Sequence, residues 1–585
     1  MPRALSLIVS ILPSFALADS GVLPLLPTRA IALSGDPVPG VPGRMHTSLS
    51  LCTINDAGEV VFGSVISPGT PAAPEMREDA VLRYTSDGTF VVARTGMPAP
   101  GLGGSFRSVS SPRAFNDRGD TVFSAEIEID MGDAGLSNSS AVFASIDDQL
   151  RLLAQRDAPV PGLPGYVYLG EFRLLSLGAD GTLASAFLVT NSDSGSEIAI
   201  HRYDDAGVTL LGGPESPSSA PSLNGATHAF VESPITASNG AVYFLAELNN
   251  DDALGIDNTN NRVIYRVDDA GTSVVFRSDD PRLDAPTGEA TALTGFVTNE
   301  RGEIVVRSTL SGPPIADFIF DELDPTQLHR ITPDEFSLLV RAGEPAAGFH
   351  DRSIHATWHR FAINNAGDAV FATTLGYSDP GVAPFLNAAD TTVYLARGGR
   401  ISPIAVSAQP VSYPNGDFPT YFWLDTAVNK LADVAMRSFQ VPALVDDVLT
   451  TYDPATEQLT VIAGEGYPFE VPLRDGTIET RIVDRVVFDF SETGGGSGLN
   501  NRRELAYTLS FTDGTSGVFV TTLGALPCTI ADLEPPFGQL DLSDLDAFIL
   551  AFLTQDPRAD IAAPFGAIDS ADIDAFAPAF VEGCP

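Results

Sequence analysis

The chain has 585 residues and carries 33 Lys plus Arg against 75 Asp plus Glu, which gives a formal net charge of −42. This charge excludes a general binder of nucleic acids or anionic membranes, because the phosphate attraction that dominates such binding becomes a repulsion. Hydrophobic residues at 44% and charged residues at 18% exclude a disordered chain, and 53 glycines with 44 prolines disfavour a mainly helical one.

Residues 1–20 have the three parts of a secretory signal peptide. Arg3 precedes a mainly apolar run from Ala4 to Leu17, and the small residues around Ala18 precede Asp19. A membrane anchor is the alternative, but a spanning helix needs about 20 apolar residues and this run is shorter. We therefore predict cleavage after Ala18, with residues 1–18 as the signal peptide. The mature protein is expected to be extracellular or at the cell surface, with no integral membrane span.

Two patterns recur about every 60 residues before residue 525. The first is an apolar run followed by a Gly/Pro turn, with prolines at Pro37, Pro98, Pro159, Pro217, Pro281, Pro345, Pro410 and Pro468. The second is Asn-x-x-Gly-x-x-x-Phe, complete at Asn55, Asn116 and Asn364 and degenerate around Gly181, Gly240, Asn299, Asn429 and Asn500. The glycine supplies a positive φ in a tight turn, and the residues after it alternate as in a half-buried strand. We interpret these asparagines as turn residues rather than catalytic ones.

A second hairpin follows in each unit, for example around Ser86-Asp87-Gly88. Other turns lie at Asp147-Asp148, Asp204 to Gly207, Asp268 to Gly271 and Gly398-Gly399. Four strands in a radially repeated unit are typical of a β-propeller blade. The sequence therefore predicts an all-β, eight-bladed propeller over residues 19–525, with an open β-solenoid or two smaller propellers as alternatives.

The phase of the repeat predicts how the ring closes. The last unit ends with a third strand at Gly517–Val520, whereas the mature chain begins with an isolated fourth strand at Arg29–Leu33. We expect these two strands to pair, because closure removes the exposed edges that an open array leaves. The N-terminal strand would then complete the last blade.

The tandem Asn-x-x-Gly units resemble the NxxGxxAF repeats of bacterial secreted proteins. The resemblance covers about residues 50–510 and implies tandem repeats with a C-terminal anchoring signal. It implies no activity.

The best candidate for an active site before the tail is a histidine-rich stretch. Residues 349–359 hold His350, His355 and His359, and on a regular strand the last two would share a face and could bind a metal. The alternative is a set of polar side chains near the channel. The Asp/Asn-rich loops Glu126–Asn138 and Asp251–Asn261 are interpreted as solvated loops, with calcium or sugar binding as the alternative.

The tail, residues 526–585, contains a duplicated loop and helix with an offset of 28 residues. Spacing of i, i+3, i+4, i+7 predicts that the first helix buries Leu545, Phe548, Ile549 and Phe552 and that the second buries Ile573, Phe576, Ala577 and Phe580. Cys528 and Cys584 bracket the unit and are expected to form a disulfide in an oxidising compartment, whereas Cys52 is interpreted as a buried small hydrophobe.

The duplicated acidic loop and helix, ending in Gly583-Cys584, resembles the dockerin domains of planctomycete-type secreted proteins. That resemblance implies tethering to a cohesin-like surface or scaffold protein and calcium in the loops. It places the ligands at Asp532, Asp541, Asp544, Asp560, Asp569 and Asp572. Three carboxylates per loop leave calcium dependent on carbonyls and water. The alternative is that Asp541 and Asp569 cap the helices while Asp544 and Asp572 occupy the third helical position.

These observations favour a secreted binding or scaffold protein that is not an enzyme. Its propeller would present a ligand surface, with carbohydrate as one candidate ligand, and its dockerin-like tail would attach it to a partner. One alternative is a polysaccharide-active hydrolase or lyase on the same scaffold, which paired carboxylates across the channel mouth would favour. Another is a purely structural surface protein, which would show neither pocket nor ligand.

Overall fold

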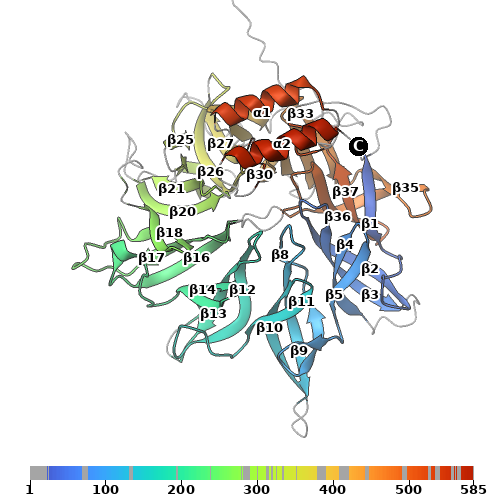
Figure 1. The fold of residues 1–585 in the computed structure, drawn as a ribbon, viewed down its shortest axis with the longest axis horizontal. Helices are drawn as coiled ribbons and strands as arrows, with labels where there is room; N and C mark the ends of the chain where they lie inside the picture. Colours follow the sequence, from blue (N-terminus) through green and yellow to red (C-terminus); the bar gives the residue numbers. More distant parts are fainter. Residues whose placement is uncertain are drawn as a thin grey trace, which may run out of the picture.

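The protein is a ring of eight antiparallel sheets arranged radially as the blades of a β-propeller (Figure 1). The structure is a computed structural model. It describes residue 23 and residues 26–583, except 69–76, 131–135, 193–194, 238, 279, 281–289, 300, 311–314, 318–320, 324–325, 333–334, 351, 378–389, 407–419, 442–446, 490–496, 525–528, 534–539, 555–558, 560 and 563–567. The proposed signal peptide lies outside the described residues.

Blades 1 to 4 follow the chain in order. They comprise β2 (Arg44–Ile54), β3 (Val60–Pro68), β4 (Glu78–Thr85) and β5 (Gly88–Arg94); β6 (Pro98–Ala99), β7 (Gly104–Val109), β8 (Ala114–Phe115), β9 (Thr121–Asp130), β10 (Leu136–Ile146) and β11 (Gln149–Gln155); β12 (Val167–Leu177), β13 (Leu183–Thr190), β14 (Glu197–Asp204) and β15 (Gly207–Gly212); β16 (His228–Thr236), β17 (Val242–Leu248), β18 (Arg262–Asp268) and β19 (Gly271–Arg277). A short 3-10 helix, Pro221–Leu223, joins blades 3 and 4.

Blades 5 to 8 continue the ring. They comprise β20 (Ala290–Thr298), β21 (Ile304–Leu310), β24 (Thr326–Ile331) and β25 (Phe336–Arg341), with a small hairpin of β22 (Ile315–Asp317) and β23 (Asp321–Leu323); β26 (Arg352–Ile363), β27 (Ala369–Tyr377), β28 (Asp390–Arg397) and β29 (Arg400–Val406); β30 (Thr420–Val428), β31 (Val434–Val441), β32 (Val448–Asp453) and β33 (Gln458–Gly464); β34 (Pro468–Pro472), β35 (Ile478–Val487), β36 (Glu504–Phe511), β37 (Ser516–Thr522) and β1 (Thr28–Leu33).

The N-terminal strand closes the ring, as the phase of the repeat predicts. β1 pairs antiparallel with β37, from Thr28 opposite Thr521 to Leu33 opposite Gly517 (Figure 1). The hydroxyl oxygens of Ser34, which follows β1, and Ser516, which begins β37, lie 2.9 Å apart and form a hydrogen bond. The predicted eight-bladed propeller and its closure are therefore confirmed, and the open solenoid is excluded.

The hydrophobic core lies between neighbouring blades. One buried cluster joins Val142 of blade 2 to Leu175 and Leu183 of blade 3, and another joins Phe62 of blade 1 to Val518 of blade 8. Alternate residues of each strand supply these clusters, as expected for sheets that are packed on both faces. Each blade therefore depends on its neighbours for burial of its apolar side chains.

The Gly/Pro turns connect successive blades. Each described proline of the motif pairs antiparallel with a residue in the first long strand of the blade or, for Pro217, with the residue directly before that strand. The pairs are Pro37 with Met45, Pro98 with Ser105, Pro159 with Val167, Pro217 with Thr227, Pro345 with Ser353 and Pro468 with Ile482. Pro281 and Pro410 lie outside the described residues. The turn therefore belongs to the blade that it precedes.

Of the two expected acidic loops, one is part of a hairpin in the structure and the other is a loop. Glu126–Asn138 is wrong as a loop, because β9 and β10 continue their pairing to Asp130 opposite Leu136. Asp251–Asn261 is a loop, and its acceptors are occupied locally: Asp251 accepts from the amide of Ala253, and Asp257 accepts from the amide of Thr259. These bonds support the interpretation of a solvated, self-bonded loop.

The tail contains two helices, α1 (Leu542–Thr554) and α2 (Ser570–Glu582). They meet through Phe548 and Phe576, whose rings stack with centroids 4.0 Å apart. Leu545, Phe552 and Phe580 join the same cluster as predicted. The predicted burial of Ile549, Ile573 and Ala577 is wrong: the two isoleucines are 45% and 43% exposed, and Ala577 is exposed too. A helix with one partner buries only the stripe that faces it, and these residues lie beside that stripe.

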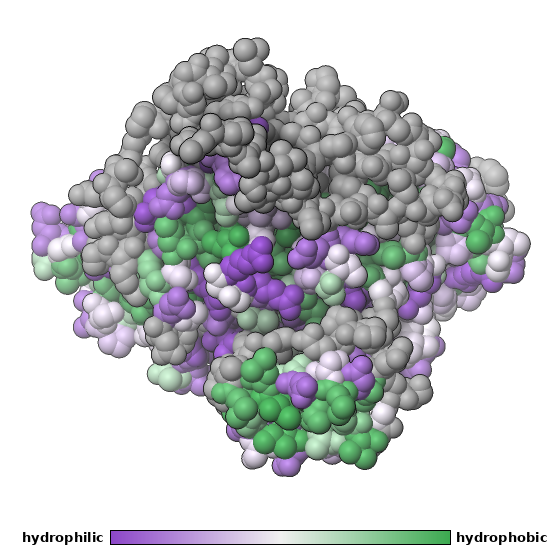
Figure 2. All heavy atoms as spheres, turned by 90° about the horizontal axis from the view of Figure 1, so that it is seen from above, coloured by the Kyte–Doolittle hydropathy of each residue, from purple (hydrophilic) through white to green (hydrophobic). Residues whose placement is uncertain are grey.

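The two helices of the tail therefore carry exposed apolar side chains, namely Leu542, Ile549, Leu550, Leu553, Ile573 and Val581. Figure 2 shows an apolar patch, drawn in green, at the bottom of the view, where the two helices of Figure 1 come to lie. Cys528 and Cys584 lie outside the described residues, so their pairing stays a prediction. No helix within the described ranges is long and apolar enough to cross a membrane.

Candidate functional site

The Asn-x-x-Gly turns are built alike and face the propeller axis. In blade 1, Asn55 Oδ1 accepts from the amide of Glu59 at 2.9 Å, and the amide of Gly58 donates to the carbonyl of Asn55 at 3.0 Å. Gly58 has a φ of +78°, which an L side chain rarely adopts. The side chain of the asparagine thus fixes the turn that it begins, as the sequence predicts.

The same asparagines also join the blades, which the sequence does not reveal. The Nδ2 of each donates to the backbone carbonyl of the equivalent residue in the next blade. The six links are Asn55 to Asn116 at 3.1 Å, Asn116 to Gly178 at 2.9 Å, Asn299 to Asn364 at 2.9 Å, Asn364 to Asn429 at 2.7 Å, Asn429 to Asn500 at 3.1 Å and Asn500 to Asn55 at 2.9 Å. We call this set of side chains the asparagine ring.

Blades 3 and 4 lack the asparagine and use another contact. Gly178 and Ala237 occupy the equivalent positions, and the amide of Thr236 donates to the hydroxyl of Ser176 at 2.7 Å. The Thr236 hydroxyl in turn donates to the carbonyl of Ser176 at 3.1 Å. Hydrogen bonds therefore link these two blades as well.

A carboxylate supports each member of the asparagine ring. The acid four residues after the asparagine accepts from its Nδ2 at 2.9–3.1 Å; these acids are Glu59, Asp120, Glu303, Asp368, Asp433 and Glu504. In blade 7 the guanidinium of Arg503 also bonds both oxygens of Asp433, at 3.0 and 2.9 Å. The recurrence of an acid at this spacing is the sequence signal that could have revealed the network.

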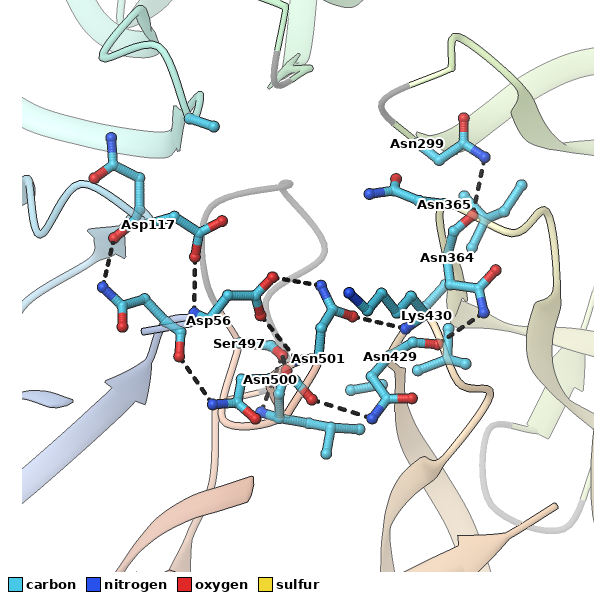
Figure 3. A pocket seen from close by; sticks show the side chains of 18 of the residues that line it. Asp56, Asp117, Asn299, Asn364, Asn365, Asn429, Lys430, Ser497, Asn500 and Asn501 are labelled. Carbon is cyan, nitrogen blue, oxygen red and sulfur yellow. Dashed lines mark hydrogen bonds between the residues drawn. The ribbon is translucent and has the colours of Figure 1, made fainter. Parts of the chain in front are cut away.

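The turns enclose a pocket on the axis with a volume of about 210 Å³. Its apolar lining comes mainly from residues that precede the turn asparagine or its equivalent. We call six of these residues the apolar collar, namely Ile54, Phe115, Leu177, Ile363, Val428 and Leu499. Its polar lining includes residues that follow the asparagine; we call Asp56, Asp117, Asn365, Lys430 and Asn501 the polar rim (Figure 3). The pocket therefore combines an apolar collar with a charged and amide rim.

Most of the polar rim is tied together by hydrogen bonds. Asp117 Oδ1 accepts from the amide of Asp56 at 2.8 Å, and both carboxylate oxygens of Asp56 accept from Asn501, at 2.8 Å from its amide and 2.7 Å from Nδ2. Asn501 Oδ1 accepts from the amide of Lys430 at 2.7 Å. These bonds hold the rim residues of blades 1, 2, 7 and 8 in fixed positions.

The charges of the rim are unequal. Enclosure within the ring of blades raises the pKa of Asp117 to about 6, although its side chain is open to the pocket. The nearby charge of Asp56 raises that pKa further, whereas the amide of Asp56 and the charge of Lys430 lower it. Lys430 is the single lysine of the chain. Asp117 therefore exchanges its proton near pH 6, with the side chain of Lys430 on the same rim.

In the tail, the predicted calcium ligands act on backbone amides. Asp544 and Asp572 are buried; Asp544 accepts from the amides of Leu533 and Asp541, and Asp572 from those of Ile561, Ala562 and Asp569. Both carboxylates therefore hold their loop against the start of its helix.

The other predicted ligands divide into caps and undecided positions. Asp541 and Asp569 accept from the amides two residues later, and Asp569 forms a capping box with Asp572. Asp532 is buried, and Asp560 lies outside the described residues. The capping interpretation is thus confirmed for four aspartates. Calcium stays a prediction, and the described residues include no cluster of three or more His, Cys, Asp or Glu that could hold a metal.

The histidine-rich stretch forms β26, but the side chains of His355 and His359 lie outside the described residues. Pairing with β27 shifts register between Ile354 and Ala356 and again between Thr357 and Phe361. Strict alternation does not hold across such shifts, so the spacing of the two histidines no longer places them on one face. Cys52 is fully buried, and burial raises its pKa to about 12, as expected for a structural thiol.

Comparison with known proteins shows the family but not an activity. No curated protein matches the chain. Among solved structures, it resembles the Dos1 propeller (9% identity over 81% of this chain and 93% of the other, TM-score 0.32) and an ulvan lyase of polysaccharide lyase family PL25 (10% identity, 70% and 92%, TM-score 0.33). It also resembles the acylaminoacyl peptidase of Pyrococcus horikoshii, at 9% identity over 71% of this chain and 52% of the other, with a TM-score of 0.33. A family model matches residues 25–211, 185–440 and 321–530, which overlap and together span 25–530, so the chain belongs to the family of unknown function DUF7453.

Proposed function

We propose that this protein is a secreted, non-enzymatic binding protein whose axial pocket takes a small polar ligand. The pocket supports this proposal because its polar rim is held in position without a ligand. The blades that carry the rim are joined to their neighbours by buried hydrogen bonds of the asparagine ring. Such preorganisation lowers the entropy cost of binding. The tail, by its resemblance to dockerins, would tether the propeller to a cohesin-like surface protein.

The observation that carries the proposal is the position of Lys430. The single lysine of the chain lies on the pocket rim, and its side chain reaches from blade 7 towards the middle of the ring (Figure 3). A charged side chain at the rim of a preformed pocket is the kind of group that orients a ligand. By contrast, the two rim carboxylates, Asp56 and Asp117, come from adjacent blades and both accept from backbone amides. That arrangement favours a binding protein over a hydrolase, because a hydrolase was expected to place its two carboxylates on opposite sides of the channel mouth.

The uniqueness of Lys430 gives a direct test. An amine-acylating reagent labels this side chain, and mass spectrometry of the Lys430 peptide separates it from the N-terminal amine. Pools of sugars, amino acids, polyamines and organic acids are then screened for protection against labelling. The proposal is supported by a pool that protects Lys430 saturably in the wild type and in the exposed-loop variant Asp252→Asn. In Asp117→Asn the affinity for the same pool should fall at least tenfold. Failure of every pool to protect Lys430 would contradict it.

The tether is tested separately with the full chain. Binding to the envelope fraction of the native organism is measured for the wild type and for the double variant Leu553→Glu/Val581→Glu, whose sites are 75% and 84% exposed. Saturable binding of the wild type, lost in the double variant and retained in Lys430→Met, supports a tail-borne tether. Equal binding by all three chains would contradict it.

A further inference from the structure

Two charged groups of the axial pocket have polar atoms that no described residue bonds. The amide of Lys430 donates to Asn501, but its ammonium forms no ion pair with any residue that the structure describes. Asp117 uses Oδ1 to accept from the amide of Asp56, while Oδ2 accepts no hydrogen bond from the described residues. A cation and one carboxylate oxygen therefore face the pocket from blades 7 and 2 (Figure 3).

Neighbouring polar groups of the rim are already occupied. Both oxygens of Asp56 are held by Asn501, and Asn501 Oδ1 is held by the amide of Lys430. The hydroxyl of Ser497 donates to the carbonyl of Leu499 and accepts from the amide of the same residue. A neutral polyol would therefore meet rim donors and acceptors that already bond one another. A ligand with two opposite charges would instead meet the ammonium of Lys430 and Oδ2 of Asp117, which no described residue bonds.

We propose that the axial pocket binds a zwitterion, specifically a free α-amino acid with an apolar side chain. This inference rests on the proposed function of the pocket. The ammonium of the ligand would pair with Asp117 and the carboxylate with Lys430, so that each charge is neutralised on transfer from water. Charge-assisted hydrogen bonds of this kind are stronger than neutral ones.

The size and the apolar collar of the pocket agree with such a ligand. A cavity of about 210 Å³ has room for one small molecule rather than a chain of sugars. The collar residues Ile363 and Val428 are partly exposed and lie one position before the turn asparagines of blades 6 and 7, next to the polar rim. An aliphatic side chain placed against them would leave water while the two charges stay at the rim, which adds a hydrophobic contribution to binding.

The test separates the two halves of the ligand. Affinities are measured by calorimetry, with protection of Lys430 as a second readout, for L-leucine, for 4-methylpentanoate, which lacks the amine, and for 3-methylbutylamine, which lacks the carboxylate. Glucose and spermidine represent the other ligand classes. We expect leucine to bind at least tenfold more tightly than either half-ligand. In Lys430→Met leucine should bind no better than the amine, and in Asp117→Asn no better than the acid, whereas Lys430→Arg and Asp252→Asn should keep the preference.

The failures are distinguishable. If glucose or spermidine protects Lys430 and leucine does not, the zwitterion is overturned while the pocket remains a binding site. If leucine and its half-ligands bind equally, the pairing of two charges is overturned. If no compound of this panel or of the wider pools protects Lys430, both the zwitterion and the binding function are overturned. Because Lys430 is exposed, its variants are expected to fold, and thermal unfolding verifies this.

Discussion

The glycine of the Asn-x-x-Gly turn is required for two separate reasons, and Gly367 illustrates both. Its φ is +81°, a conformation that costs an L-residue about 1–2 kcal/mol. A Cβ at this position would also lie 2.6 Å from Glu303 Oε2 of the preceding blade and closer still to Arg330. The turn backbone therefore packs directly against Glu303, which supports Asn299 of the preceding blade, and against Arg330, which bonds Glu303.

A glycine pair separates the two reasons. Gly476 has a φ of +83°, but a Cβ added there would meet no atom within 4 Å, so Gly476→Ala should cost only the backbone strain, about 1–2 kcal/mol. Gly367→Ala should cost roughly 1–3 kcal/mol more, because a small-to-large change in a packed junction displaces its neighbours. Denaturant unfolding of the two variants measures the difference. Equal losses would show that the close approach to Glu303 does not matter.

At this scale the sequence predicts the turn but not the link that its asparagine makes. The turn is local, since Asn364 Oδ1 and the amide of Asp368 are four residues apart. The link from Asn364 to the carbonyl of Asn429 spans 65 residues and exists only once the blades stand side by side. Blade geometry rather than residue type decides such a contact. The pocket that these links frame could not be derived for the same reason.

At the scale of elements, the Gly/Pro turn shows which features of a blade the periodicity of the sequence predicts. The repeat places each proline near the start of a unit, and in the structure Pro37, Pro159 and Pro345 bridge to the first strand of their blade. The spacing predicts the unit, whereas the bulges in those first strands, such as the one between Leu49 and Cys52, have no signal in the pattern. Register shifts of the same kind flank His355 and His359, so periodicity alone does not decide whether these residues share a face.

The loop–helix units of the tail yield a prediction about Asp572. Its buried carboxylate accepts from three backbone amides, so Asp572→Ala leaves those donors without an acceptor and should destabilise the tail by about 2–4 kcal/mol. Asp574→Asn, on the exposed face of α2, should have little effect. Hydrogen exchange of the tail amides in the full chain measures both, and an Asp572→Ala tail as protected as the wild type would contradict the capping role.

The same amides report on calcium. If the resemblance to dockerins extends to metal binding, chelation should lower amide protection around Asp541 and Asp569 in the wild type, and added calcium should restore it. Protection that does not change with chelator would show that the aspartates only cap the helices. The propeller amides serve as the internal control, since no change is expected there.

At the scale of the whole molecule, buried histidines connect the fold to pH. His46, His201, His228 and His329 are each at most 1% exposed, and burial lowers the pKa of each from 6.5 to about 4. Below pH 6.5 the unfolded chain binds protons at these sites and the folded chain does not. The free energy of unfolding should therefore fall as the pH drops from about 6.5 towards 4, by up to roughly 3 kcal/mol per histidine.

Buried carboxylates act in the opposite direction, so the test uses a variant. Burial raises the pKa of Asp433 and Glu232, and these groups favour the folded state on acidification. His228→Asn keeps a partner for the hydroxyl of Ser216 without titrating. Between pH 6.5 and 4 its free energy of unfolding should decrease less steeply than that of the wild type. The difference in slope corresponds to the one proton that His228 binds in the unfolded wild-type chain. Identical slopes would show that His228 is not buried neutral.

Closure of the ring by β1 makes the first blade and the last blade depend on the same strand. β1 covers the edge of β37, and its residues Ile31 and Ala32 are buried in the cluster shared with blade 1. Removing residues 19–34 exposes that edge and opens a junction of the core, so we expect a large loss of thermal stability together with self-association through the uncovered strand. A shorter truncation, residues 19–22, leaves Leu23 and its bridge to Phe469 in place and serves as the control. Calorimetry and size-exclusion chromatography compare the two chains. A longer truncation that melts like its control and stays monomeric would mean that the asparagine ring, which runs from Asn500 to Asn55 without β1, suffices to hold the propeller shut.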